Sequence, residues 1–521
     1  MGCPQVLAYW SVMNDQSDLS QGEGAAQLSL GRRMASGALW LVGLRLVLRG
    51  LGLLSTLILA RLLVPEDFGL VALASTAAAF LETASDFNFD LAIIRQNDTT
   101  RDDYDTAWTL NLIKALVVAT CLYFGAGWLA GFFDDPRLEV LFELMALAVV
   151  IQGFWSVRTI DFRKNLELEK EFRFRVWAKV ASFVIVVALA FWWRSYWALI
   201  VNIVLGRAIL LILSYWLAPY RPRLCLAAWG RLIHFSKWLA LNNLFCFLRD
   251  RMDTIVIGKY AGAAPLGLYS VAHEIADLPT SELALPVNRA VYPGFARMVD
   301  DLDLLRRTYV NSFALLILIT TPIGVGIGLL AEPIVALFLG THWLPAAPLI
   351  QALIVYGLLR TSTANANAIY LALGRVRIEP ALTALFIVMV LPALVIGVKT
   401  WGVMGAACVL TAGAILNLGI NLFVVARLLN ISWSRLLSAL WRTALATMAM
   451  AAMVLGLPSP WTTSALVIAW SAPIGAFTFT GVLLASWHFS GRPDGPERSL
   501  LEYMGDHFGW LQPRGDQKRA I

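Results

Sequence analysis

Charged side chains inside long apolar stretches are the residues of this 521-residue sequence best suited to binding chemistry. Each of them costs about 2.5–3.5 kcal/mol at the centre of a bilayer on insertion scales, so it should face water, another charge or a substrate. We therefore predict a hydrated cavity between the spans. The basic residues that we assign to it as candidate substrate ligands are Arg45, Arg49, Arg207 and Arg360.

A second group of charges suggests coupling or gating. Arg249 and Asp253 lie four residues apart, a spacing that predicts a neutralising pair on one face of a helix. Glu274 and Asp277 fall on one stripe of the following segment. We predict that these four residues couple or gate transport, and that the Arg249–Asp253 pair rearranges when the protein changes conformation.

The elements that position these charges are membrane spans. Hydrophobic residues make up 59% of the sequence and charged residues only 15%, and apolar runs of 18 or more recur through most of it. This pattern predicts an all-α polytopic membrane protein. We expect about fourteen spans, near 36–61, 68–94, 107–133, 138–157, 176–193, 196–218, 233–258, 266–296, 308–330, 347–373, 378–398, 401–426, 436–457 and 463–488.

A weak internal repeat relates two of the predicted hairpins. The stretch LILARLLVPEDFGLVALA (57–74) matches IVIGKYAGAAPLGLYSVA (255–272) without a gap. Gly69 aligns with Gly267 and Arg61 with Lys259. Each copy ends one span, turns at a loop containing proline or glycine, and begins the next. Paired halves of this kind are typical of transporters.

The distribution of Lys and Arg predicts the orientation. If the N-terminus is cytoplasmic and the spans alternate, the cytoplasmic loops hold about five times as many Lys and Arg residues as the opposite loops. We therefore place both ends of the sequence in the cytoplasm.

Several functions are disfavoured by what the sequence contains. The cysteines and the five histidines show no metal-ligand spacing, and there is no GxxxxGK[ST] segment for ATP hydrolysis. The outer loops are short, whereas embedded glycosyltransferases usually present acidic residues in larger ones. We expect no enzymatic activity, no cofactor, no metal and no nucleic-acid partner.

Four segments carry a resemblance to a known family. They are ARLLVPEDFGLVALA (60–74), DFNFDLAIIRQ (86–96), DDYDTAWTLNL (102–112) and RMDTIVIGKYAGAAPLGLYSVA (251–272). The sequence resembles bacterial Wzx-type polysaccharide and O-antigen flippases, which are grouped in one superfamily with multidrug and toxin extrusion (MATE) antiporters. The resemblance covers about residues 34–430. Asn88 stands where glycine is common in that family.

The resemblance implies two pseudo-symmetric six-helix lobes, alternating access, and a polyprenyl-pyrophosphate oligosaccharide as cargo for lipopolysaccharide or exopolysaccharide synthesis. The pyrophosphate would suit the arginines, because a guanidinium group binds phosphate oxygens through two nitrogens. Further expected partners are the bilayer, a coupling ion (H⁺ or Na⁺) and polysaccharide polymerase machinery. The predicted segments are a polar tail (1–33), an N-lobe (34–218), a linker (219–232), a C-lobe (233–427), two further spans (428–488) and a second tail (489–521).

Two alternative functions remain at this point. A cation-coupled drug antiporter would share the fold, although its cavity should be more acidic. A membrane glycosyltransferase or polymerase would act on the same lipid-linked sugar by forming a new bond.

Overall fold

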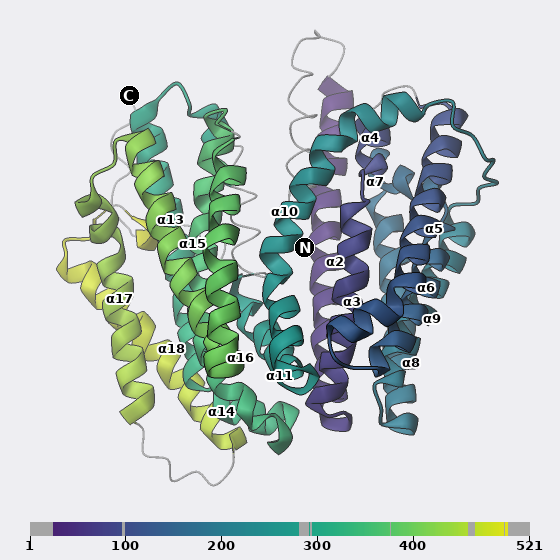
Figure 1. Cartoon of the computed structure of the whole chain (residues 1–521). Coiled ribbons are helices and arrows are strands. Elements are labelled where there is room, and N and C mark those ends of the chain that lie inside the picture. Colours follow the sequence, from purple (N-terminus) through teal and green to yellow (C-terminus); the bar gives the residue numbers. More distant parts are fainter. Residues whose placement is uncertain are drawn as a thin grey trace. The chain divides into compact units, whose positions relative to one another are not determined.

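The computed structural model of the protein describes residues 24–95, 99–280, 291, 294–375, 377–456, 464–493 and 495–498. All regular elements in this part of the chain are helices (Figure 1). The chain forms two compact units. The first contains the described residues up to Val271, with Phe338–Trp343 and Leu391–Ala406. The second contains Ala272–Leu337, Leu344–Val390 and the described residues from Ala407 onward.

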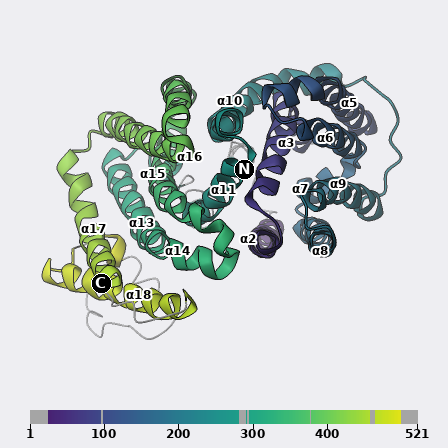
Figure 2. The ribbon, with the colours of Figure 1, turned by 60° about the horizontal axis from the view of Figure 1, so that its bottom comes forward.

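The first unit is built mainly from the N-terminal helices. The helices α5 and α6 lie side by side in Figures 1 and 2, and α8 packs against α2 and α9. The elements are α2 (Gly24–Leu62), α3 (Pro65–Ala84), α4 (Phe89–Arg95), α5 (Arg101–Phe132), α6 (Arg137–Gly153), η1 (Val157–Ile160), α7 (Asp161–Lys164), α8 (Leu168–Trp193), α9 (Trp197–Leu217), α10 (Trp229–Ala261) and α11 (Ala263–Ala276), of which α11 continues into the second unit.

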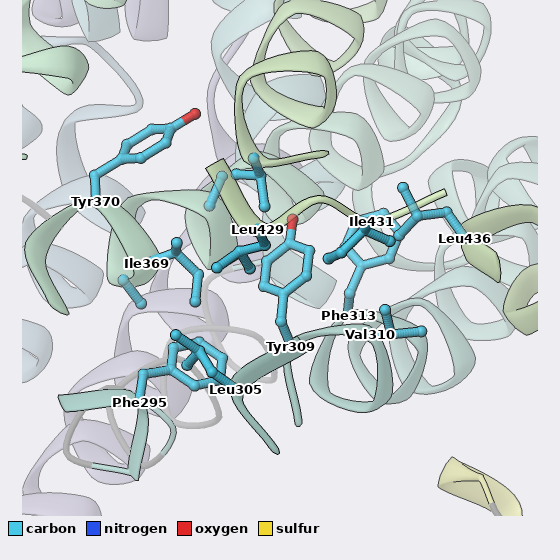
Figure 3. Close-up of a cluster of buried hydrophobic side chains, with 13 residues drawn as sticks. Phe295, Leu305, Tyr309, Val310, Phe313, Ile369, Tyr370, Leu429, Ile431 and Leu436 are labelled. Carbon is cyan, nitrogen blue, oxygen red and sulfur yellow. The ribbon is translucent and has the colours of Figure 1, made fainter. Parts of the chain in front are cut away.

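The second unit has an aromatic core at one end of its longest helices. Figure 3 shows Tyr309, Phe313 and Tyr370 among buried aliphatic side chains, and the rings of Tyr309 and Phe313 are stacked. The elements are α13 (Leu302–Leu329), α14 (Ala331–Ile334), η3 (Val335–Leu339), η4 (Thr341–Ala346), α15 (Ala347–Ala372), α16 (Ile378–Leu429), α17 (Trp433–Gly456) and α18 (Ser464–Phe489), with parts of η3, η4 and α16 belonging to the first unit.

The last two helices are packed onto α13 rather than left alone in the membrane. Leu318 of α13 lies in one buried cluster with Met450 of α17 and Phe479 of α18. The helices α17 and α18 also lie beside each other in Figure 1. The burial of these apolar side chains fixes the C-terminal pair to the second unit.

The structure confirms an all-helical polytopic membrane protein, whereas the predicted number of fourteen spans is not confirmed. Ten described helices are long and apolar enough to cross a membrane, or eleven if α6 and the segment bent from it by 73° form one span. The element α16 covers two predicted spans, 378–398 and 401–426, and its two helical parts meet at a break where Trp401 and Gly402 leave the helical conformation, Gly402 with φ +61°. Charged residues keep α10 below the hydropathy that a span usually has. The second half of the predicted span 266–296 lies largely outside the described residues.

The predicted hairpin at 57–74 is present. The helix α2 ends at Leu62 and α3 begins at Pro65, where the missing N–H of proline is tolerated in a first helical turn. Asp67 Oδ2 accepts the N–H of Val64 at 3.2 Å, and Asp67 Oδ1 accepts the N–H of Tyr196 at 3.0 Å. The second copy turns at Gly262, which has φ +85°, between α10 and α11. Pro65 and Gly262 therefore mark the two turns, and the contact with Tyr196 also holds the first one.

Asn88, which stands where glycine is common in the family, forms the turn between α3 and α4. Its φ is +50°, a left-handed conformation that glycine adopts freely and asparagine tolerates better than most residues. Its N–H donates to Asp86 Oδ1 at 3.2 Å, and the residue is buried. Asparagine thus keeps the sharp turn that a glycine would give.

Candidate functional site

An ion pair joins two membrane helices of the first unit. Arg207 Nη1 of α9 lies 2.7 Å from Glu82 Oε1 of α3, and the side chains are 19% and 25% exposed. Among the described residues, Glu82 is the carboxylate that Arg207 binds, and the contact is made through Nη1. The other nitrogens of the fork keep their N–H groups for a further anion. Arg207 is therefore a cation that is partly compensated and partly accessible.

A second ion pair lies just beyond the end of α3. Lys114 Nζ of α5 lies 3.4 Å from Asp86 Oδ1, in the turn after α3, so Glu82 and Asp86 bind cations from different helices. The side chain of Lys114 is 23% exposed. Both pairs offset the cost of placing charge between membrane helices. The two partners of each pair are far apart in the sequence, so an i, i+4 spacing could not predict either ion pair.

The other candidate arginines are divided between the units. Arg45 and Arg49 lie on α2 of the first unit, and both are half-buried. Arg360 lies on α15 of the second unit and is also half-buried. The structure thus brings Arg45, Arg49 and Arg207 into one unit and places Arg360 in the other.

The predicted ion pair between Arg249 and Asp253 is not present, which corrects the interpretation of their spacing. Arg249 Nε binds the neighbouring residue instead, at 3.0 Å from Asp250 Oδ1. Asp253 is only 6% exposed, and its Oδ2 accepts the hydroxyl hydrogen of Tyr269 on α11. Asp253 Oδ1 accepts the N–H of Thr254 at 2.7 Å. Burial against α11 turns this carboxylate away from the arginine.

Because Asp253 binds Tyr269, we predict that substitutions of these two residues have non-additive effects on the free energy of unfolding. Asp253→Asn and Tyr269→Phe should each lower the free energy of unfolding by about 1–3 kcal/mol, since each disturbs a buried hydrogen bond. Together they should cost at least about 0.5 kcal/mol less than the sum. Arg249→Gln should add to Asp253→Asn without coupling. Thermal unfolding in detergent measures all of these, and a rescue of Asp253→Asn by Arg249→Gln would contradict the assignment.

Glu274 and Asp277 lie at the end of α11, in the second unit. Both are half-buried, and the N–H of Asp277 continues the helix by donating to His273 O at 2.9 Å. The helical turn therefore continues to Asp277, so Glu274 and Asp277 share one stripe as predicted. Their predicted role in coupling or gating stays a prediction.

A polar junction at the start of α5 explains the DDYDTAW motif, whose contacts the sequence did not predict. Asp105 is 2% exposed and accepts the hydroxyl hydrogen of Tyr220 at 2.5 Å and the N–H of Arg223 at 2.9 Å. Thr109 Oγ1 accepts the N–H of Cys225 at 3.1 Å. Burial raises the pKa of Tyr220, and the Asp105 carboxylate raises it further. The hydroxyl therefore remains a donor, and the segment after α9 is tied to α5.

The comparison with protein families identifies the chain's relatives. The profile of the family described as "Polysaccharide biosynthesis protein" matches residues 58–348, which is more than half of the chain. The chain belongs to this family. Its relatives include the lipopolysaccharide biosynthesis protein WzxC of Escherichia coli, with 26% identity over 80% of this chain and 85% of that protein. The teichuronic acid biosynthesis protein TuaB of Bacillus subtilis is 23% identical over 72% of this chain and 79% of its own length. The predicted resemblance to Wzx-type proteins is confirmed.

Solved structures show which fold this family member adopts. The lipid II flippase MurJ in an inward closed conformation superimposes with a TM-score of 0.70 at 12% identity, covering 87% of this chain and all of that one. An inward-facing MATE-family multidrug resistance transporter gives a TM-score of 0.55 at 14% identity, over 74% of this chain and 94% of its own. The predicted MATE-like fold is confirmed, and at these identities the likeness shows the fold alone.

Proposed function

We propose that the protein is a flippase that moves a polyprenyl-pyrophosphate oligosaccharide between the leaflets of the inner membrane, from the cytoplasmic to the periplasmic side. Its relatives carry names from lipopolysaccharide and teichuronic acid biosynthesis, and a protein of similar fold moves lipid II. The geometric observation that carries the proposal is Arg207, a partly accessible cation between membrane helices that binds Glu82 through Nη1. A pyrophosphate could take the remaining donors.

The chemistry of this cargo fits the charges that the chain retains in its helices. We propose Arg45, Arg49, Arg207 and Arg360 as ligands of the pyrophosphate, because a guanidinium fork matches two phosphate oxygens. Asp253, Arg249, Glu274 and Asp277 are proposed to couple or gate the movement. H⁺ or Na⁺ as a driving ion and polymerase machinery as a partner belong to the same proposal. So does the absence of bond-forming chemistry, since a flippase only relocates its substrate.

Alternating access requires two halves that move against each other. We propose that these are the lobes 34–218 and 233–427, related by a pseudo-two-fold axis, with 219–232 as their linker and 428–488 as an addition. The ungapped repeat between 57–74 and 255–272 supports this division. The two lobes would expose the arginines to each side of the membrane in turn.

A test in cells separates this function from synthesis of the glycan. In a strain that lacks the gene, surface polysaccharide should disappear while the complete lipid-linked precursor accumulates, because assembly precedes translocation. Loss of the precursor itself would indicate a biosynthetic enzyme and would reject the proposal. The readouts are immunoblotting of surface glycan and mass spectrometry of extracted lipid.

The proposed orientation has its own prediction. A reporter that is active only in the periplasm should be silent when fused after Ile521 and active when fused near Ser459, because the Lys- and Arg-rich loops stay in the cytoplasm. Both positions lie outside the described residues. A reporter active after Ile521 would mean that the number of spans is odd and that the assignment of sides is wrong.

A further inference from the structure

Two glycines allow the hairpins of the internal repeat to touch through their backbones. A methyl carbon on Gly69 would lie 1.8 Å from the carbonyl oxygen of Ala263, and one on Gly267 would lie 1.7 Å from that of Pro65. Carbon and oxygen cannot approach so closely. Both glycines are buried, and neither has a left-handed φ that would itself call for glycine. Their lack of a side chain is therefore needed for contact between α3 and α11.

The contact follows the repeat reciprocally. In the ungapped alignment of 57–74 with 255–272, Gly69 corresponds to Gly267 and Pro65 to Ala263. Each glycine faces the residue that corresponds to the one faced by the other. A contact in which residue i meets j while the equivalent of i meets the equivalent of j is the mark of a two-fold axis. The hairpins thus pack as a pseudo-symmetric pair.

Two cations that also correspond in the repeat extend the symmetry. Lys259 Nζ lies 2.6 Å from Asp134 Oδ2, in the turn between α5 and α6. Its counterpart Arg61 donates from Nε to the carbonyl oxygen of Phe338 at 3.0 Å, in the connection between α13 and α15. Asp134 lies between the third and fourth predicted spans, and Phe338 between the ninth and tenth, which are equivalent places in two six-span halves. Each cation therefore reaches the equivalent loop.

We propose that these residues form a symmetric seal that closes one end of the transport path, and that Gly69 and Gly267 are the positioning residues that allow it to close. The inference rests on the proposed function and deepens it. Contact through bare backbone is close enough to exclude a substrate. It also involves few side chains, so it can open again when the lobes move. In the orientation that we propose, this is the periplasmic end.

Alanine at either glycine tests the seal. It is a better helix former than glycine, so the added methyl group acts by its contact with the opposing backbone. Gly52 of α2 is the matched control, because nothing lies within 4 Å of a methyl carbon there. A carbodiimide joins amines to adjacent carboxylates. The amount of Lys259–Asp134 cross-link in the purified protein therefore measures how far the seal is closed. The Lys170–Glu167 pair, 2.7 Å apart at the start of α8, serves as internal reference.

We expect Gly69→Ala and Gly267→Ala each to lower the Lys259–Asp134 cross-link at least about fivefold against the reference, since overpacking must separate the hairpins. Both should also reduce glycan export, and Gly52→Ala should change neither. An unchanged cross-link in both variants, or a loss in only one of them, would overturn the symmetric seal. Normal export after loss of the cross-link would overturn its role in transport. Loss of the cross-link in a protein that moves no glycan even as wild type would support the seal and reject the proposed function.

A second measurement applies if the alanine variants do not fold. Cross-linked wild-type protein in liposomes should no longer move lipid-linked glycan, because the end is held shut. Lys259→Gln cannot form this bond, so treated and untreated Lys259→Gln protein should move the lipid at the same rate. Full transport by the cross-linked wild-type protein would overturn the proposal.

Discussion

Simultaneous replacement of Glu82 and Arg207 by alanine should leave the protein inserted in the membrane but reduce glycan export at least about tenfold. Removing both charges leaves neither uncompensated between α3 and α9, so folding should survive. Export should nevertheless fall, because a hydrogen bond to a charged group contributes about 1.5–3 kcal/mol. Membrane protein level and surface polysaccharide are the two readouts.

The single variants separate structure from binding. Glu82→Ala leaves Arg207 without its carboxylate and should cost up to about 2.5–3.5 kcal/mol, lowering the amount of inserted protein. Arg207→Lys keeps a positive charge beside Glu82 but cannot contact two phosphate oxygens, so export should be only partly retained. If the double alanine variant exports glycan normally, Arg207 serves the structure and is not a ligand of the cargo.

Substitution of Glu497 by glutamine should be the most destabilising single change in the C-terminal part of the chain. Arg442 of α17 is buried, and its Nε and Nη2 bind the two oxygens of Glu497 at 2.8 and 3.2 Å. The side chains are only 8% and 2% exposed. Loss of the carboxylate charge leaves a buried cation uncompensated, which costs about 3–5 kcal/mol. Thermal unfolding in detergent should show a clear decrease in melting temperature.

The exposed pair Arg173–Glu169 provides the control for this prediction. Its side chains are 63% and 49% exposed, so Glu169→Gln should change stability by less than about 1 kcal/mol. Arg442→Leu combined with Glu497→Leu should recover most of the loss, since no charge remains buried. Equal effects of Glu497→Gln and Glu169→Gln would show that the Arg442–Glu497 pair contributes little to holding α17.

The sequence predicted those features of the fold that depend on local composition. Apolar runs located the helices, and the proline and glycine of the repeated hairpins marked turns that the structure contains at Pro65 and Gly262. The number of spans was harder to predict. The helix α10 carries Arg249 and Asp253 within its length, and the segment after α6 is bent from it by 73°. Length and hydropathy alone do not decide such cases.

The candidate site was predicted less completely, because its contacts join residues that are far apart in the chain. Spacing identified Arg207 as a cation without a partner on its own helix, but could not show that α3 supplies Glu82. Spacing was wrong for Asp253, whose partner is Tyr269 of the next helix. Glu497 was assigned to a polar tail, although the structure packs it against Arg442. In each case tertiary packing decided which partner a charge finds.

The most direct test of the proposed function is transport by the purified protein in liposomes. A labelled polyprenyl-pyrophosphate oligosaccharide would be placed in one leaflet, and its arrival in the other followed with a membrane-impermeant glycosidase. Our account predicts that wild-type protein moves the lipid and leaves it chemically unchanged by mass spectrometry, while Arg207→Ala moves it at least about tenfold more slowly. A lengthened or transferred glycan, or no movement above that in protein-free liposomes, would contradict it.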